Sequence, residues 1–456
     1  MKRIQLALCI GLIAQFCFGP ASTAAIEQPQ SDPGIERYTA ITKRLMMSAI
    51  ELERFSLKYR LESARQPKFR RFRYFLAQET GSAGGLAFEI VSLKQLDIGK
   101  SHPLKIDKNQ LHGAFTTATT ASIIAASGSA FELSSNFYRS IQLRKQGYDT
   151  ESSRKFVVSH LREIDGLLTE REKIISVLPN SSGRERAIVE TEILHDLRSA
   201  FAGEFTEFQS DLRGFHATQN TFYFLNASYN TIGAISAGYG YKSVTCPWVG
   251  GTTNILFLAT GALAGVTPAI SSTVGAVIRN HSKASLRKDF GITKKFDSGA
   301  LAAHCAQLEK LTDASGDHFI ASLPATQRLA IYSQSGELFR TQLANETRLS
   351  RKLSQVALQM SELGPPIGGL LLTQGILGTV AAYNYQRRPF KQLTLNYDGA
   401  VLGTVGFGMG VVGNAALLLA NWSFENTLKK KNQLPRQLIF QRLNHLDDLE
   451  KTVQSI

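Results

Sequence analysis

Hydrophobic and polar positions divide the chain into two kinds of segment. In the first kind, apolar residues recur every three or four positions among many charges, as at Tyr38, Ile41 and Leu45. This spacing places the apolar side chains on one face and is typical of an amphipathic helix that packs in water. Such segments cover roughly residues 35–78, 152–178, 183–212, 298–311, 326–362 and 435–449.

The second kind of segment is long, rich in small residues and free of charge. It occurs at residues 113–131, 217–241, 251–278, 364–386 and 399–424, and a weaker version with two carboxylates occurs at 76–93. A helix needs about 20 apolar residues to cross a bilayer. Glycine pairs such as Gly261/Gly265 and Gly364/Gly368 let helices approach closely in lipid, whereas each glycine would cost about 1 kcal/mol in a helix exposed to water. We therefore expect the segments of the second and third pairs, 217–241 with 251–278 and 364–386 with 399–424, to cross a membrane. In the first pair, the helix at 76–93 with its two carboxylates either is interfacial or shielded from lipid, or lies outside the bilayer.

The uncharged segments come in pairs that are joined by short loops at 94–110, 242–250 and 386–398. A leucine and two basic residues follow each pair, at intervals of 143 and 142 residues: Leu143-Arg144-Lys145, Leu286-Arg287-Lys288 and Leu428-Lys429-Lys430. A fixed period of this length predicts one structural unit used three times. The expected fold is all-α. It has three pseudo-repeats at residues 35–178, 183–312 and 322–455, each a Gly/Ala-rich apolar helical hairpin flanked by long amphipathic helices.

Six basic residues mark the points at which the second helix of each hairpin would leave the membrane. Long Lys and Arg side chains in such positions extend to lipid phosphates. The candidate headgroup contacts are Arg144, Lys145, Arg287, Lys288, Lys429 and Lys430. The net charge of +14 suits either solvated helix surfaces or an anionic partner. We expect that partner to be the lipid bilayer and not a nucleic acid.

The N-terminus has the organisation of a secretory signal peptide. Lys2 and Arg3 precede an apolar stretch at residues 4–18, and small residues follow Pro20. This stretch is short for a membrane span, so residues 1–25 are expected to be removed after export. Export places the amphipathic helices on the extracytoplasmic side of the cell membrane. Basic residues in the first and third short loops agree with this orientation, whereas the basic pairs lie on the opposite face.

Residues with recognisable catalytic or ligand-binding chemistry are few. The chain contains no zinc-protease motif, phosphate-binding loop, dinucleotide fingerprint or Cys/His cluster, and we expect no enzymatic activity, cofactor or metal. The best candidates are polar groups inside the apolar segments, because their burial in lipid has to be compensated. Glu79 and Glu89 can ionise, and Asn254, Gln374 and Asn414 are amides. These groups would either line a conduction path or form hydrogen bonds between helices.

Three functions agree with this organisation. The favoured one is an integral membrane protein with an extracytoplasmic helical layer and a non-catalytic scaffold role, acting through a helical protein partner or through self-association. The second is a membrane transporter or channel, in which the three hairpin repeats surround a path. The third is a soluble exported helical bundle with its Gly/Ala-rich hairpins buried at the centre.

Overall fold

The computed structural model describes residues 33–64, 69–178, 182–293, 296–313, 364–432 and 434–454. The expected signal peptide and the expected helix at 326–362 lie outside these ranges. All regular structure in the described residues is helical, which confirms the all-α prediction. The α-helices are α2 (Pro33–Ala64), α3 (Arg70–Ser101), α4 (Lys108–Lys145), α5 (Thr150–Val177), α6 (Ser182–Ser243), α7 (Gly250–Asp289), α8 (Ser298–Asp313), α11 (Gly364–Asn384), α12 (Pro389–Lys430) and α13 (Pro435–Gln454).

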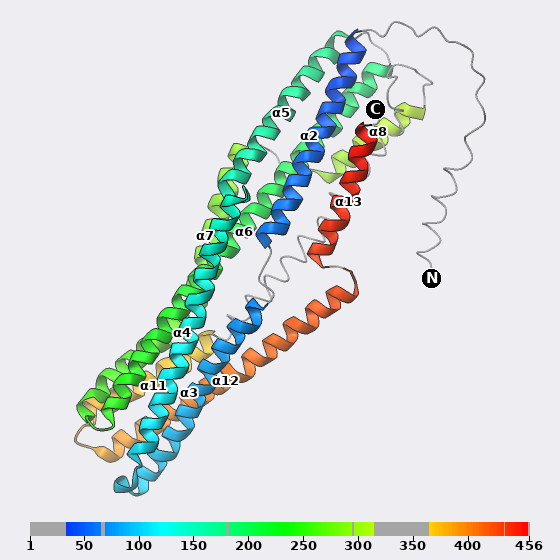
Figure 1. The fold of residues 1–456 in the computed structure, drawn as a ribbon. Coiled ribbons are helices and arrows are strands. Elements are labelled where there is room, and N and C mark those ends of the chain that lie inside the picture. The colour runs from blue at the N-terminus through cyan, green and yellow to red at the C-terminus, as the bar shows by residue number, and fades with distance from the viewer. Residues whose placement is uncertain are drawn as a thin grey trace.

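The molecule is elongated and has two parts (Figure 1). We call one part the polar bundle; it contains α2, α5, the first half of α6, α8 and α13. The other part, the apolar bundle, contains α3, α4, the second half of α6, α7, α11 and α12. Helix α6 has 62 residues and, at 1.5 Å per residue, is about 93 Å long. It therefore runs continuously through both bundles, whereas the sequence suggested two separate segments.

The polar bundle has the core expected of a protein in water. Leu45, Leu161, Leu168 and Phe205 are buried together where α2, α5 and α6 meet, and charged residues lie outside. Helix α13 covers a second face of α2 through a separate apolar cluster. Burial of apolar faces in this way is the ordinary source of stability for amphipathic helices.

The apolar bundle is a closed ring of six helices. Each helix packs against two neighbours, in the order α3, α4, α6, α7, α11, α12 and back to α3. The six helices form three pairs that are consecutive in the chain: α3 with α4, α6 with α7, and α11 with α12. A short turn joins the helices of each pair at one end of the molecule (Figure 1). The first of these turns is shorter than the predicted loop at 94–110. Asp107 accepts hydrogen bonds from the backbone N–H groups of Asn109 and Gln110 and so begins α4 early, while α3 continues to Ser101.

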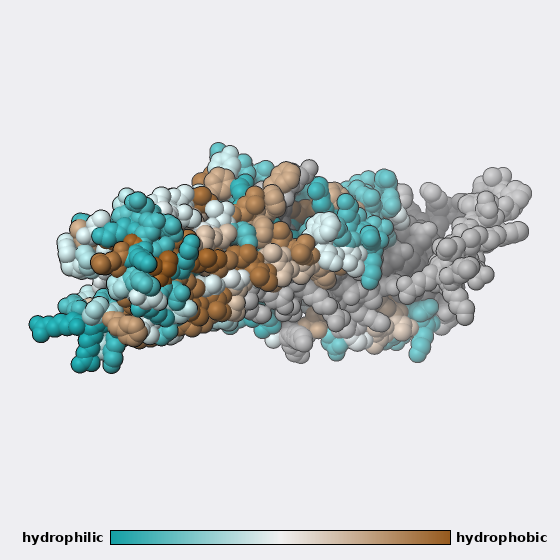
Figure 2. Space-filling model, turned by 90° about the horizontal axis from the view of Figure 1, so that it is seen from below, coloured by the Kyte–Doolittle hydropathy of each residue, from teal (hydrophilic) through white to brown (hydrophobic). Residues whose placement is uncertain are grey.

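The apolar bundle buries small and polar residues and exposes larger apolar ones, which is the opposite of the polar bundle. In α7 the buried residues include Gly261, Thr267 and Ser271, whereas Val266 and Ile270 are exposed. Figure 2 shows hydrophobic residues gathered in a band along this part of the surface, with hydrophilic residues at the end that carries the short turns. Helices α7, α11 and α12 are long and apolar enough to cross a membrane. This surface is compatible with a membrane protein.

Glycines provide the close contact between α7 and α11 that their spacing predicted. A Cβ on Gly368 would lie 2.3 Å from the backbone nitrogen of Gly265, and a Cβ on Gly261 would lie 2.4 Å from the backbone nitrogen of Leu372. Any side chain at these positions would force the two helices apart. The small residues therefore set the distance between neighbouring helices of the ring.

Candidate functional site

A cavity of about 1490 Å³ lies within the ring, and all six helices contribute to its wall. It extends from the level of Phe88 and Phe115, near the short turns, to the junction with the polar bundle, where Arg60 and Arg436 line it. The rings of Phe88 and Phe115 are 4.8 Å apart between centroids. The cavity therefore lies where a path through the centre of the ring, parallel to its helices, would run.

The wall within the uncharged segments carries no ionised group and combines polar side chains with apolar ones such as Ile367, Leu371 and Leu418. It also includes amides, hydroxyls, small residues and aromatic rings, among them Ser82, Ser122, Asn226, Asn230, Ser236, Asn254, Phe257, Thr260, Thr267, Ser271, Gln374, Phe407 and Asn414. The charged residues that line the cavity, such as Arg70, Asp211 and Arg279, lie outside those segments. Such a lining suits an uncharged molecule that forms hydrogen bonds.

Helix α6 presents a row of amides and rings to the cavity. Asn220, Tyr223, Asn226 and Asn230 recur at three- and four-residue intervals and so share one helix face. The amide of Asn226 donates to the Tyr74 hydroxyl at 3.0 Å, and its oxygen accepts from Asn230 at 2.6 Å. This polar face explains why α6 is less apolar than α7 although both belong to the ring.

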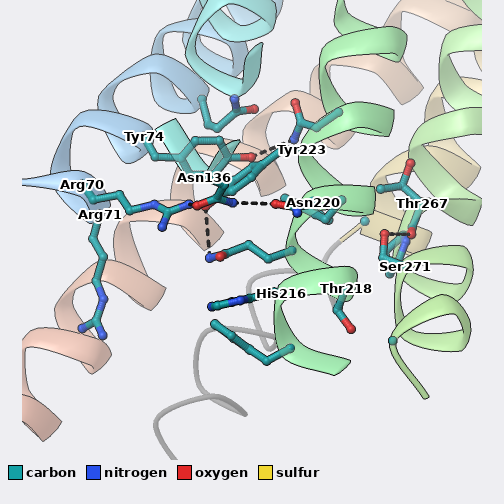
Figure 3. Close-up of a pocket in the computed structure, with 18 of the residues that line it drawn as sticks. Arg70, Arg71, Tyr74, Asn136, His216, Thr218, Asn220, Tyr223, Thr267 and Ser271 are labelled. Atoms are coloured by element: carbon teal, nitrogen blue, oxygen red, sulfur yellow. Dashed lines mark hydrogen bonds between the residues drawn. The ribbon is translucent and has the colours of Figure 1, made fainter. Parts of the chain in front are cut away.

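A buried ionic cluster closes the wall at the junction, and Figure 3 shows its member Arg70 together with Asn136 and Asn220. The carboxylate of Glu132 is buried and forms ion pairs with Arg70 at 2.8 Å and with Arg73 at 2.6 Å. Arg70 also donates to the Asn136 oxygen at 2.7 Å, and the Asn136 amide donates to Asn220 at 2.6 Å. Two arginines compensate one buried carboxylate, so this end of the cavity has a positive rim.

His216 adds no charge to this rim at neutral pH. Burial lowers its pKa to about 4, and the positive charges of Arg139 and Arg70 act in the same direction. The imidazole lies beside the ionic cluster in the cavity wall (Figure 3). It therefore offers a neutral hydrogen-bonding group to a molecule entering from the junction.

The predicted intramembrane polar groups meet in pairs between helices. Glu89 of α3 is buried and accepts a hydrogen bond from the Gln374 amide of α11 at 2.6 Å. Asn414 of α12 donates to Ser82, about one turn along α3 from Glu79, at 3.5 Å. Asn254 lies against Gly378, where α7 meets α11. Gln374, Asn414 and Asn254 line the cavity as well.

The six predicted headgroup contacts occupy the last turns of α4, α7 and α12. They are Arg144, Lys145, Arg287, Lys288, Lys429 and Lys430, and all of them are exposed. The leucine that precedes each pair points inward, and Leu286 and Leu428 are buried. The structure therefore places these residues at helix ends and not in the cavity, and Leu286 belongs to the core of the polar bundle.

Sequence reasoning missed the amide row of α6 and the cluster around Glu132. The row carries a detectable signal, because asparagines at helical spacing inside an uncharged segment mark a polar face. The cluster carries none, because Arg70 and Glu132 belong to different helices.

No family model matches this chain, and no curated protein or solved structure matches it. The function is therefore argued from the site itself.

Proposed function

We propose that the protein is a membrane transporter or channel whose six-helix ring binds a small uncharged polar solute and lets it cross the bilayer. The observation that carries this proposal is a cavity of about 1490 Å³, with amides and hydroxyls among its apolar wall residues, inside a ring whose outer surface is apolar. A scaffold would need no polar interior, because small apolar side chains pack helices in lipid without it. The geometry thus favours the second of the three functions considered above.

The proposal requires all six helices of the ring to cross the membrane, including the three less apolar ones. Their outer faces support this, since Ile90 on α3, Ile123 on α4 and Phe224 and Ile235 on α6 are exposed. A helix that lines a polar cavity needs an apolar surface on its lipid side only. Lower mean hydropathy is therefore expected of α3, α4 and α6.

Similar helix ends support three hairpin repeats around the path. Each second helix ends in an inward leucine and two exposed basic residues, followed within four positions by a residue in the left-handed conformation. These residues are Gly147, Gly291 and Asn432, with φ values of 75°, 64° and 51°. In the part of the chain that the structure describes, no other residue has a positive φ. A shared helix ending of this kind agrees with one unit used three times.

The shape of the cavity favours access from the polar bundle. Beyond Phe88 and Phe115, the buried side chain of Gln95 is hydrogen-bonded to Gln110 and to the backbone of Asp107, at 2.8 and 2.9 Å. These contacts join α3 to α4 on the short-turn side. We propose that the solute enters from the extracytoplasmic side, where a signal peptide would place the polar bundle. The basic helix ends would contact lipid headgroups on that side.

The proposal is tested by solute entry into proteoliposomes. Vesicles with purified protein are mixed with hyperosmotic urea, glycerol, erythritol or glucose, and reswelling is followed by light scattering. We expect faster reswelling than in empty vesicles for at least one solute. Asn226→Leu and Asn230→Leu should slow it on the order of tenfold, since each removes cavity hydrogen bonds worth about 1 kcal/mol.

The matched control is Phe224→Leu, on the same helix but 59% exposed on its outer face. It should leave the rate unchanged. Reswelling no faster than in empty vesicles for every solute would overturn the proposal. So would an equal loss of rate in the control, because that result would trace the effect to general damage of α6.

A further inference from the structure

Glu89 lies in the wall of the ring where α3, α11 and α12 meet, and its side chain is completely buried. Its hydrogen-bond partner Gln374 lines the cavity. Gly403 of α12 closes the third side. A Cβ at that glycine would lie 2.4 Å from Gln374 Oε1 and 2.6 Å from Glu89 Oε1, so only glycine leaves room for the pair.

The hydrogen bonds of this pair leave two acceptors without a donor. Gln374 Nε2 donates to Glu89 Oε1 at 2.6 Å. Glu89 Oε2 and Gln374 Oε1 are also buried, and neither has a hydrogen-bond partner. Buried polar atoms are almost always hydrogen-bonded, so two orphaned oxygens in one pair require an explanation. A single hydrogen between them would satisfy both.

Among the residues that the structure describes, no basic side chain pairs with the Glu89 carboxylate. Helix α11 (Gly364–Asn384) has no charged residue. On α3, the nearest ionisable residue is Lys94, five residues or about 7.5 Å along the helix, where it is exposed, and Glu79 is ten residues or about 15 Å away in the other direction. On α12, Asp398 is exposed, and the Tyr397 ring packs against Lys100. On α4, the ionisable side chains nearest along the chain are His112 and Glu132, at opposite ends of its uncharged segment.

We propose that Glu89 and Gln374 form the proton-binding site of this membrane protein. Glu89 holds a proton on Oε2 and donates it to Gln374 Oε1, while Gln374 Nε2 donates to Glu89 Oε1. Acid and amide then form a closed pair with two hydrogen bonds. On release, the O–H bond breaks, the proton passes to water in the cavity, and a carboxylate with one hydrogen bond remains.

Proton release would thereby weaken the contact between α3 and α11 at the cavity wall. An uncompensated carboxylate at this depth is unfavourable, so the released state favours a different helix arrangement that admits water. This coupling of proton binding to solute movement rests on the proposed function. The proton site itself does not, because it follows from the geometry of the pair.

Infrared difference spectroscopy of the whole protein in lipid tests the site directly. We expect a carbonyl-stretch band of a protonated carboxylic acid at neutral pH, lost in Glu89→Gln and retained in the matched variant Glu79→Gln. Glu89→Gln should fold normally, because its amide can donate to Gln374 Oε1 as the acid does. Gln374→Leu should shift the band to the position of an acid without an acceptor, which gives a second measurement independent of Glu89→Gln.

Three results would overturn the proton site: no such band in the wild type, a band that survives in Glu89→Gln, or loss of the band when sodium replaces choline. The last result would assign the orphaned oxygens to a sodium ion. Coupling is tested separately in proteoliposomes, where an imposed pH gradient should drive solute accumulation in the wild type but not in Glu89→Gln. A band at Glu89 without any solute entry would refute the transport function alone, and solute entry without the band would refute the proton site alone.

Discussion

Helices α5 and α7 belong to the same molecule and bury opposite kinds of residue. In α5 the buried positions include Val157, Leu161 and Leu168. In α7 they include Gly261 and Ser271, together with other small residues. Water outside the polar bundle drives apolar side chains inward, but lipid outside a helix gives them no such preference. The contrast agrees with water around the polar bundle and a membrane around the apolar bundle.

Buried carboxylates are also compensated differently in the polar bundle and in the part of the apolar bundle away from the junction; at the junction itself, Glu132 pairs with Arg70 and Arg73. In the polar bundle, Arg171 and Glu190 are both buried and pair at 2.7 Å, and Arg171 also donates to Thr42 at 3.0 Å. In the apolar bundle, Glu89 has an amide as its partner. A full ion pair keeps its charges when it is buried only with good geometry and extra hydrogen bonds. The amide partner instead leaves protonation as the way to neutralise Glu89.

Replacement of an exposed residue by arginine should produce the largest difference in stability effect between the two bundles. Val266, in the middle of the uncharged part of α7, is 46% exposed, and Val177 at the end of α5 is 81% exposed. Val266→Arg should destabilise the membrane-inserted protein by about 2.5–3.5 kcal/mol, because the charge would face hydrocarbon. Val177→Arg should change the free energy of unfolding by less than about 0.5 kcal/mol.

The measurement for both variants is the yield of membrane-integrated protein and its thermal unfolding in bicelles. Equal tolerance of arginine at the two positions would show that α7 faces water, and would restore the soluble bundle considered at the outset.

Two neighbouring glycines of α11 compare a position that faces α7 with a position that faces open space. A Cβ on Gly368 would meet the α7 backbone at 2.3 Å, whereas a Cβ on Gly369 would have nothing within 4 Å. Gly368→Ala should therefore lower the free energy of unfolding by about 1–3 kcal/mol through overpacking. Gly369→Ala should leave it unchanged or raise it by up to about 1 kcal/mol, because alanine favours the helix.

Denaturant unfolding in mixed micelles compares the two variants under one set of conditions. If both alanines behaved alike, the contact between α7 and α11 would not depend on close backbone approach.

Much of the apolar bundle could be predicted because its signals are local. The uncharged lengths of α7, α11 and α12 and the Gly261/Gly265 and Gly364/Gly368 pairs are visible within single segments. The ring itself could not be predicted, since its closure brings α3 against α12, far apart in the chain. Glu89 and Gln374 were both recognised as polar groups in apolar segments. Their pairing depends on that closure, so the sequence alone did not connect them.

The two free cysteines in the described part of the chain test the orientation of the bundles in the cell. Cys246 lies in the turn between α6 and α7, and Cys305 lies on α8 in the polar bundle. In the variants Cys246→Ser and Cys305→Ser, each of which keeps one of these two thiols, a membrane-impermeant maleimide should label Cys305 in intact cells and leave Cys246 protected. Permeabilised cells provide the reference for complete labelling.

The rate at which Cys305 is labelled depends on the pH of the reaction. Burial, and then the negative charge of Asp196, raises the pKa of the Cys305 thiol, so its reactive thiolate is scarcer at neutral pH than that of an ordinary cysteine. Its labelling rate should keep rising at alkaline pH after that of a free thiol has levelled off. Labelling of Cys246 with protection of Cys305 at every pH would invert the orientation and place the mouth of the cavity in the cytoplasm. The ring and its polar interior would be unchanged by that result, because neither depends on which side the polar bundle faces.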